Sequence, residues 1–105
     1  MARFDVFRNT GSHAGEVPFL LDVQSTLLAD LETHVVVPLR RCDKFPAVRI
    51  PADLAPVFTI DGIVCMMQTS LLAAVPAGIL KKPVTSLAAE LQRIVAALDF
   101  LFDGY

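Results

Sequence analysis

Hydrophobic and polar residues alternate in two patterns along this chain. The C-terminal segment has a helical period, and the rest has shorter apolar runs. From Ser86 to Tyr105, apolar side chains recur every three or four residues, as in a helix with one apolar face. The stripe comprises Leu87, Leu91, Ile94, Val95, Leu98, Leu101 and Phe102. Thr85 or Ser86 can cap the first turn, and Gly104 can end the helix in a left-handed conformation. The pattern predicts a C-terminal helix that packs against strands.

Shorter apolar runs in the rest of the chain predict strands. Residues 3–8, 18–24 and 33–39 are rich in β-branched and aromatic residues, and 47–50 alternates briefly. The run 18–24 is apolar nearly throughout, with Asp22 the exception, which predicts burial on both faces. The polar, glycine-containing segment 9–16 predicts a loop.

A β-hairpin is predicted at Val57 to Met67, where Asp61-Gly62 separates two β-prone runs. Aspartate and glycine accept the positive φ that both centres of a type I′ turn require. The following segments predict a helical turn at 68–72, a loop at 74–76 and a short strand at 77–80. Together these elements predict an α+β fold, with a mostly antiparallel sheet followed by one helix.

Composition and charge narrow the function classes. The chain has 105 residues, 54% of them hydrophobic and 19% charged, which suits one domain over 1–105 with apolar surface left for a partner. A homodimer is the simplest partner. The net charge is −2 and no basic run exceeds two residues, so direct nucleic-acid binding has little electrostatic support. Arg3, Asp5 and Arg8 exclude a signal peptide, and the longest apolar run is too short for a membrane span.

Few side chains suggest chemistry. His13 lies in a polar loop, where solvation is expected, and His34 begins a strand, where a rim position is expected. Asp22 is expected to bond to backbone within its strand. Neither histidine has a partner at ligand spacing, so no zinc site and no cofactor are predicted. Cys42 and Cys65 lack a CxxC spacing and are interpreted as reduced thiols of a cytosolic protein, with one disulfide left open.

Two short regions carry exposed features. Leu27 and Leu28 are adjacent, and neighbours on a regular strand cannot both face inward, so one of them is expected to be exposed. Asp99 and Asp103 are four residues apart near a helix C-terminus, where they repel one another and oppose the helix dipole. Either the helix end has a function, or it is a solvated tip at a cost of a few tenths of a kcal/mol.

Several motifs resemble the CcdB family of bacterial toxins. The segment 19–25, FLLDVQS, is similar to the family's (F/Y)-apolar-apolar-D-V-Q-S strand, and 35–39, VVVPL, is similar to M-V-I-P-L. The separation of Asp22 from Pro38 also resembles that of the family. Further likenesses are Met66-Met67 followed by Ala74-Val75-Pro76, and the ending ALDFLFDGY at 97–105. The resemblance covers nearly the whole chain and is weakest at 9–16 and 40–55.

This resemblance implies an SH3-like barrel with a small accessory sheet and one C-terminal helix, as in CcdB- and MazF-like toxins. It implies a cytoplasmic homodimer that is not an enzyme and needs no cofactor. The family binds the A subunit of DNA gyrase and traps the cleaved DNA complex. The resemblance further implies a CcdA-like antitoxin whose disordered tail wraps the toxin, and contact with operator DNA only through the repressing toxin–antitoxin complex.

The resemblance also implies which residues contact gyrase. These are Leu27, Leu28, Asp99, Phe102, Asp103, Gly104 and Tyr105. Two positions depart from the best-known member, because Asp103 replaces a tryptophan and Tyr105 replaces a terminal isoleucine. Since tryptophan commonly anchors interfaces, one alternative is a degenerate homologue that binds antitoxin without poisoning gyrase. Another is a ribonuclease toxin on the same barrel, against which the sequence shows no Arg/His/Asp cluster.

Overall fold

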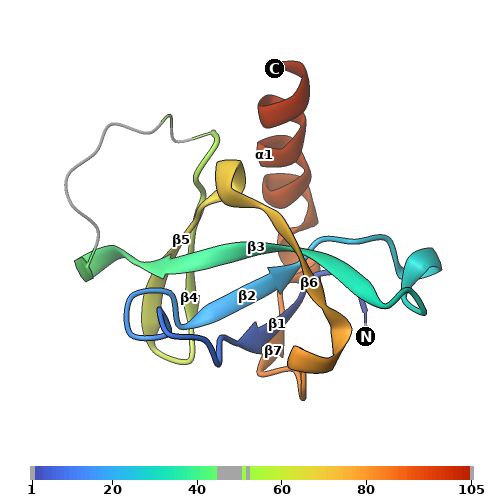
Figure 1. The fold of residues 1–105 in the computed structure, drawn as a ribbon. Helices are drawn as coiled ribbons and strands as arrows, with labels where there is room; N and C mark the ends of the chain where they lie inside the picture. The colour runs from blue at the N-terminus through green and yellow to red at the C-terminus, as the bar shows by residue number, and fades with distance from the viewer. Residues whose placement is uncertain (1, 45–50, 52, 105) are drawn as a thin grey trace.

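The computed structural model describes residues 2–44, 51 and 53–104, and within them seven strands form one antiparallel sheet (Figure 1). The strands are β1 Asp5–Arg8, β2 Phe19–Asp22, β3 Thr33–Arg41, β4 Val57–Ile60, β5 Ile63–Met67, β6 Ala73–Pro76 and β7 Thr85–Ser86. Their order is β4-β5-β3-β2-β1-β7, with β6 paired to β3 off this path. The sheet curls into a nearly closed SH3-like barrel and the helix α1, Leu91–Asp103, follows it, which confirms the predicted α+β fold. The short strand predicted at 47–50 lies outside the described residues.

The long strand β3 is the junction of the sheet. Its N-terminal half, Thr33 to Val36, pairs with β6, and its last residues, Leu39 to Arg41, pair with β5. On its other edge it pairs with β2, with Asp22 opposite Val36. The β4–β5 hairpin is therefore joined to the rest of the sheet through the C-terminal half of β3.

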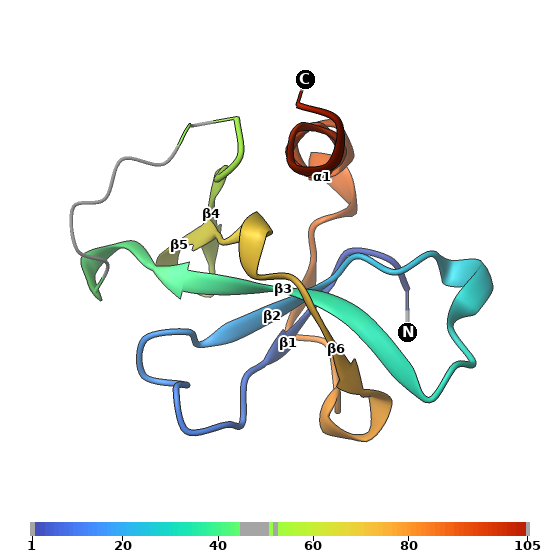
Figure 2. The ribbon, with the colours of Figure 1, turned by 45° about the horizontal axis from the view of Figure 1, so that its top comes forward.

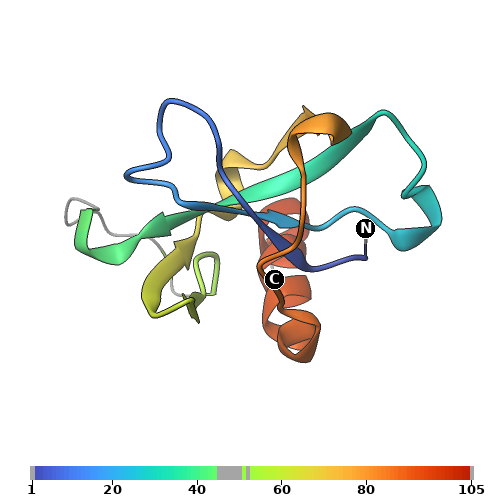
Figure 3. The same ribbon diagram turned by 90° about the horizontal axis from the view of Figure 1, so that it is seen from below.

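The central strands are buried on both faces, as their continuous apolar character predicts. Successive residues belong to different clusters: Val6 and Leu21 pack in the larger cluster, and Phe7 and Leu20 in the smaller one. The larger cluster also contains Ile94 and Ala97 of α1. The smaller cluster is closed by Leu80, which follows η4 Ala77–Ile79, and by Val75 of β6. Seen from below, β6 and η4 lie on the opposite side of β3 from α1 (Figure 3).

Two predictions for this second face were wrong. Residues 74–76 were predicted as a loop, but they belong to β6, which pairs with β3. Residues 77–80 were predicted as a strand, but η4 occupies most of them as a 3₁₀ turn. Proline has no backbone N–H, so it is disfavoured in a strand where that N–H would bond to a neighbouring strand. Pro76 is the last residue of β6, which pairs with β3 alone in the sheet.

The predicted hairpin is confirmed. The β4 and β5 strands flank Asp61 and Gly62, whose φ angles are 51° and 80°. Both are positive, as a type I′ turn requires. The helical turn predicted at 68–72 is confirmed as η3, Thr69–Leu71.

The C-terminal helix is shorter than its apolar stripe and only half of it is covered. Thr85–Ser86 form β7 and pair with β1, a 3₁₀ turn spans Ala88–Glu90, and α1 begins at Leu91. Ile94 and Ala97 are buried, whereas Leu91 is 46% and Phe102 70% exposed. The predicted packing of the helix against the strands is therefore confirmed at Ile94 and Ala97, whereas the C-terminal end of α1 projects beyond the sheet (Figures 1 and 2).

Candidate target-binding surface

The two leucines of the predicted site lie in a short turn rather than a strand. Leu27 and Leu28 belong to η1, Thr26–Leu28, and are 94% and 49% exposed. Only one of them was expected to be exposed. Both face solvent because a 3₁₀ turn that lies off the sheet does not alternate its side chains between two faces.

A buried pair lies directly beneath this turn. The Nδ1 atom of His34 lies 2.9 Å from Oδ2 of Asp22, with both side chains 2% exposed. The Nε2 atom lies 3.0 Å from the carbonyl oxygen of Ala29. Since that carbonyl can only accept, Nε2 donates to it, and one further proton is shared between Nδ1 and Oδ2. The prediction that His34 lies at the rim was wrong, since it is buried with a carboxylate 12 positions away in the sequence.

The remaining polar residues of the FLLDVQS motif bond to the same turn. Oδ1 of Asp22 accepts the backbone N–H of Gln24 at 3.0 Å, which confirms the expected bond to backbone. The Nε2 amide of Gln24 donates to the carbonyls of Leu28 and Thr33. Ser25 Oγ caps η1 by accepting from the backbone N–H of Leu27 at 3.2 Å. Each polar side chain of the motif thus bonds to backbone in or beside the turn.

The second group of predicted site residues lies at the free end of α1. Asp99, Phe102, Asp103 and Gly104 are all exposed, and Tyr105 lies outside the described residues. Gly104 has a φ of 81°, and its N–H donates to the carbonyl of Phe100 at 3.0 Å, so the predicted left-handed helix end is confirmed. Residues three and four apart share one helix face, so Asp99, Phe102 and Asp103 lie together. Within the described ranges, neither aspartate has an ion-pair partner.

The two groups do not meet within one chain. In Figures 1 and 2, η1 lies at the right-hand edge of the molecule, while the end of α1 stands at the top. A single target that touches both groups in one chain would have to extend along the molecule.

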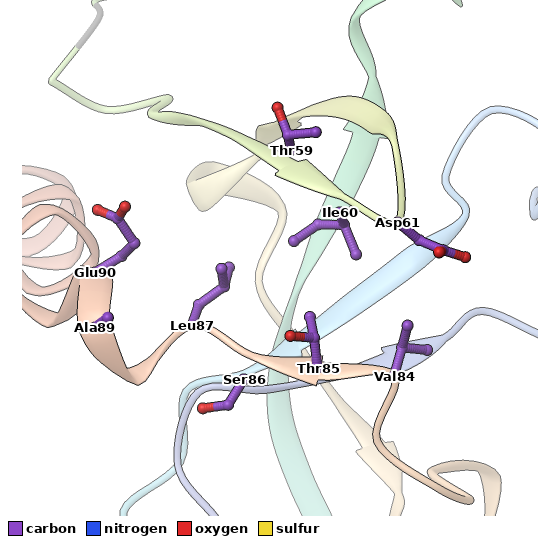
Figure 4. Close-up of a pocket in the computed structure, with 9 residues that line it drawn as sticks. All are labelled: Thr59, Ile60, Asp61, Val84, Thr85, Ser86, Leu87, Ala89 and Glu90. Carbon is purple, nitrogen blue, oxygen red and sulfur yellow. The ribbon is translucent and has the colours of Figure 1, made fainter.

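A surface groove of about 490 Å³ marks where the barrel is not closed (Figure 4). It lies between β4 and β7, the two ends of the sheet order. Ile60 and Leu87 point toward each other across this seam and both belong to the larger core cluster. Ser86 points away, and its Oγ accepts the N–H of Ala88. The groove is thus a seam of the fold, and its serine side chain bonds to the neighbouring backbone.

A second groove, of about 420 Å³, gathers groups that the sequence did not reveal as neighbours. His13, Glu16 and Arg40 line it, together with apolar residues such as Leu71. The side chain of Arg40 pairs with that of Glu16 at 3.0 Å, and the Glu16 carbonyl accepts the backbone N–H of Arg41, which ties the 9–16 loop to β3. The predicted loop is confirmed. Sequence spacing gives no signal for this cluster, because Glu16 and Arg40 are 24 positions apart.

The other side chains that could be reactive or bind metal are either unreactive or too far apart to form a site. Both cysteines are free, and burial raises the pKa of the Cys65 thiol to about 11, so its nucleophilic thiolate is scarce at neutral pH. Among the described residues, no three His, Cys, Asp or Glu side chains gather as a metal site would require. No described helix is both long and apolar enough to cross a membrane.

A comparison with protein-family models gives a match. The model of a protein family described as "CcdB protein" matches residues 3–104, so it includes η1, the buried pair and the end of α1. Among curated proteins, no similar sequence is found.

Proposed function

The chain belongs to the CcdB family and is a toxin of a toxin–antitoxin module, and from this premise we propose that it poisons DNA gyrase. In this proposal it binds the A subunit of gyrase and traps the complex between gyrase and cleaved DNA. It acts by binding and is not an enzyme. The toxin domain comprises residues 1–105.

The observation that carries this proposal is the exposure of large apolar side chains at the positions that resemble the family's gyrase contacts. Phe102 is 70% and Leu27 94% exposed, and exposed aromatic and aliphatic side chains commonly anchor protein interfaces. An apolar side chain that stays exposed adds no hydrophobic stability to the fold. A partner that covers these two residues therefore accounts for their presence. The contacts we propose are Leu27, Leu28, Asp99, Phe102, Asp103, Gly104 and Tyr105.

We also propose a homodimer in which the ends of two α1 helices lie side by side. The half-exposed stripe along α1 supports this arrangement, because Leu91 at its start remains uncovered in the single chain. A cytoplasmic antitoxin similar to CcdA would cover the remaining apolar surface with a tail that folds on binding. The toxin–antitoxin complex, rather than the acidic toxin alone, would bind operator DNA and repress the operon.

The decisive experiment is growth after induction in two hosts that differ only in the gyrase A subunit. We expect growth arrest in the sensitive host and none in the host with an altered A subunit. Deletion of Asp103 to Tyr105 should abolish the arrest and leave the melting temperature and antitoxin binding nearly unchanged. Val64→Ala is the matched control, since it trims an exposed apolar residue, 47% accessible, on β5. Arrest in both hosts would exclude gyrase as the target, and a toxic truncated protein would exclude the helix end as the site.

The groove beside the 9–16 loop favours one second candidate, a ribonuclease toxin. It brings a histidine, an arginine and a carboxylate together, which are the groups that acid–base cleavage of a phosphodiester uses. The ion pair between Arg40 and Glu16 argues against it, because it engages the cation that would hold a phosphate. Arrest in both hosts, with RNA cleavage by purified protein that His13→Ala removes, would favour this candidate over gyrase poisoning.

A further inference from the structure

We propose that Gln24 is a positioning residue of the target-binding surface. Its side-chain amide clamps the turn 25–32, so that Leu27 and Leu28 are presented to the target in one conformation. This inference rests on the proposed function, since it concerns how the proposed leucine contacts are held.

The clamp consists of three hydrogen bonds from one side chain. Nε2 of Gln24 donates to the carbonyl of Leu28 at 2.9 Å and to that of Thr33 at 3.2 Å. Oε1 accepts the backbone N–H of Val35 at 3.1 Å. Leu28 ends η1, whereas Thr33 and Val35 belong to β3. One amide therefore joins the exposed turn to the strand that follows it.

Other elements hold the turn near its two ends, where Thr26 Oγ1 accepts the backbone N–H of Arg3 at 3.1 Å and the Glu32 carbonyl accepts that of Ala77 at 2.8 Å. The middle of the turn has less to order it. Leu27 and Leu28 are too exposed for apolar packing to fix them, and Leu31 is also 52% exposed. The backbone bonds within the turn are short-range ones, such as Leu28 N–H to Ser25 and Leu31 N–H to Leu28. Segments with few buried contacts open at low free energy unless other bonds hold them. Side-chain bonds to the backbone must therefore supply the order.

The buried pair supports the clamp from below. His34 holds the carbonyl of Ala29, and Asp22 holds the backbone N–H of Gln24 itself. Asp22 thereby fixes the backbone from which the Gln24 side chain extends. The Gln24 bonds are the outer part of this network, and they link the carbonyl of Leu28 to β3 through one side chain.

The chemistry of the clamp requires an amide of this length. Two of its partners are carbonyls that need a donor, and the third is an N–H that needs an acceptor. An amide offers both, whereas a carboxylate only accepts and would face two carbonyl oxygens. Methionine has a similar length and forms none of the three bonds. Gln24→Glu thus removes the two bonds to carbonyls and Gln24→Met removes all three, so the two variants weaken the clamp in independent ways.

The test compares both variants with Gln92→Glu, the same chemical change at an exposed position on α1. We expect amide hydrogen exchange at Leu28 and Leu31 to accelerate in the Gln24 variants only. We expect their affinity for the purified gyrase A subunit to fall about tenfold, because a mobile turn must be ordered on binding. The assay is run below the melting transition of every variant, so a loss of folded protein does not contribute.

A double-mutant cycle separates positioning from a merely structural role. If Gln24 acts through the leucines, Gln24→Met should weaken binding far less when Leu27→Ala and Leu28→Ala are already present. Equal losses in both backgrounds, or unchanged exchange at Leu28 and Leu31, would overturn the inference. If the alanine substitutions themselves leave affinity unchanged, the proposed leucine contacts and this inference fall together. If they weaken binding while Gln24→Met does not, only this inference falls.

Discussion

Two regions of this toxin present apolar side chains to solvent, and they are held in different ways. The turn 25–32 carries Leu27 and Leu28 and is fixed by the side chains of Asp22, Gln24 and His34. The end of α1 carries Phe102 and is held by the hydrogen bonds of its own helix, closed by Gly104. Its aspartates have no ion-pair partner among the described residues.

The difference shows that the backbone structure of an exposed segment decides how many side chains from other elements are needed to hold it. The last carbonyls of an exposed helix end can bond to water, so the tip needs no side chains from other elements. It is free to vary and can accept an aspartate where the best-known member of the family has a tryptophan. A short turn satisfies few of its own groups, so it depends on fixed polar partners in the neighbouring strands. Substitutions should therefore be costly under the turn and tolerated at the tip.

The largest expected effect is the loss of the buried pair under the turn. Asp22→Ala leaves the imidazole of His34 buried without its carboxylate and the N–H of Gln24 without its acceptor. A buried polar group that loses its hydrogen-bond partner typically costs about 1–3 kcal/mol, and here two groups lose theirs. We expect a loss of that size in the free energy of unfolding measured with urea.

Asp103→Ala is the matched change at the tip, and we expect it to alter the free energy of unfolding by less than about 0.5 kcal/mol. Similar losses for the two variants would contradict the comparison, because the tip would then be as integrated with the fold as the turn.

An effect of intermediate size, on target affinity, is expected when an aromatic side chain is added at the end of α1. Asp103 is exposed, so Asp103→Trp should be accommodated without rearrangement. An aromatic anchor in a desolvated pocket is commonly worth ~2 kcal/mol or more, which predicts a rise of roughly tenfold or more in affinity for the gyrase A subunit. Asp103→Ser removes the charge without adding an anchor. An equal gain from the serine variant would show that relief of charge repulsion, and not the aromatic ring, improves binding.

The parts of the fold that were predicted correctly depend on neighbouring residues in the sequence. Asp61-Gly62 defines the hairpin and Gly104 the end of α1, because positive φ is a property of one or two residues. Burial of β2 on both faces is likewise predictable from the strand's own run of apolar residues.

The parts that were missed depend on partners distant in the sequence. The burial of His34 requires Asp22 on the adjacent strand, and β6 requires the N-terminal half of β3 as its partner. The apolar stripe of α1 could not show that its distal part lacks a covering layer, since periodicity does not reveal where a sheet ends. The clamp by Gln24 was missed for the same reason, because two of its three bonds reach residues nine and eleven positions away.

The smallest effect is expected from one substitution, glycine to valine, made at two glycines with nearly the same φ angle. Gly62 and Gly104 have φ angles of 80° and 81°, and an added Cβ meets nothing within 4 Å at either position. Backbone strain is therefore the common cost of Gly62→Val and Gly104→Val, about 1–2 kcal/mol for a left-handed β-branched residue. At Gly62 the hairpin cannot open without exposing Phe58, Ile60 and Met67 of the core, so global stability should fall by the whole amount.

At Gly104 the strain can be relieved by unwinding the last turn of α1, which carries exposed residues. The global melting temperature should then stay nearly constant, while hydrogen exchange accelerates at the end of the helix and the toxin loses activity. Circular dichroism melts together with exchange at residues 100–104 measure both quantities. A fall in the global melting temperature as large as that of Gly62→Val would mean that the tip is packed against something essential to the fold, such as a second copy of the chain. In that event the tip would share the constraint of the turn, and its tolerance of Asp103 would need another explanation.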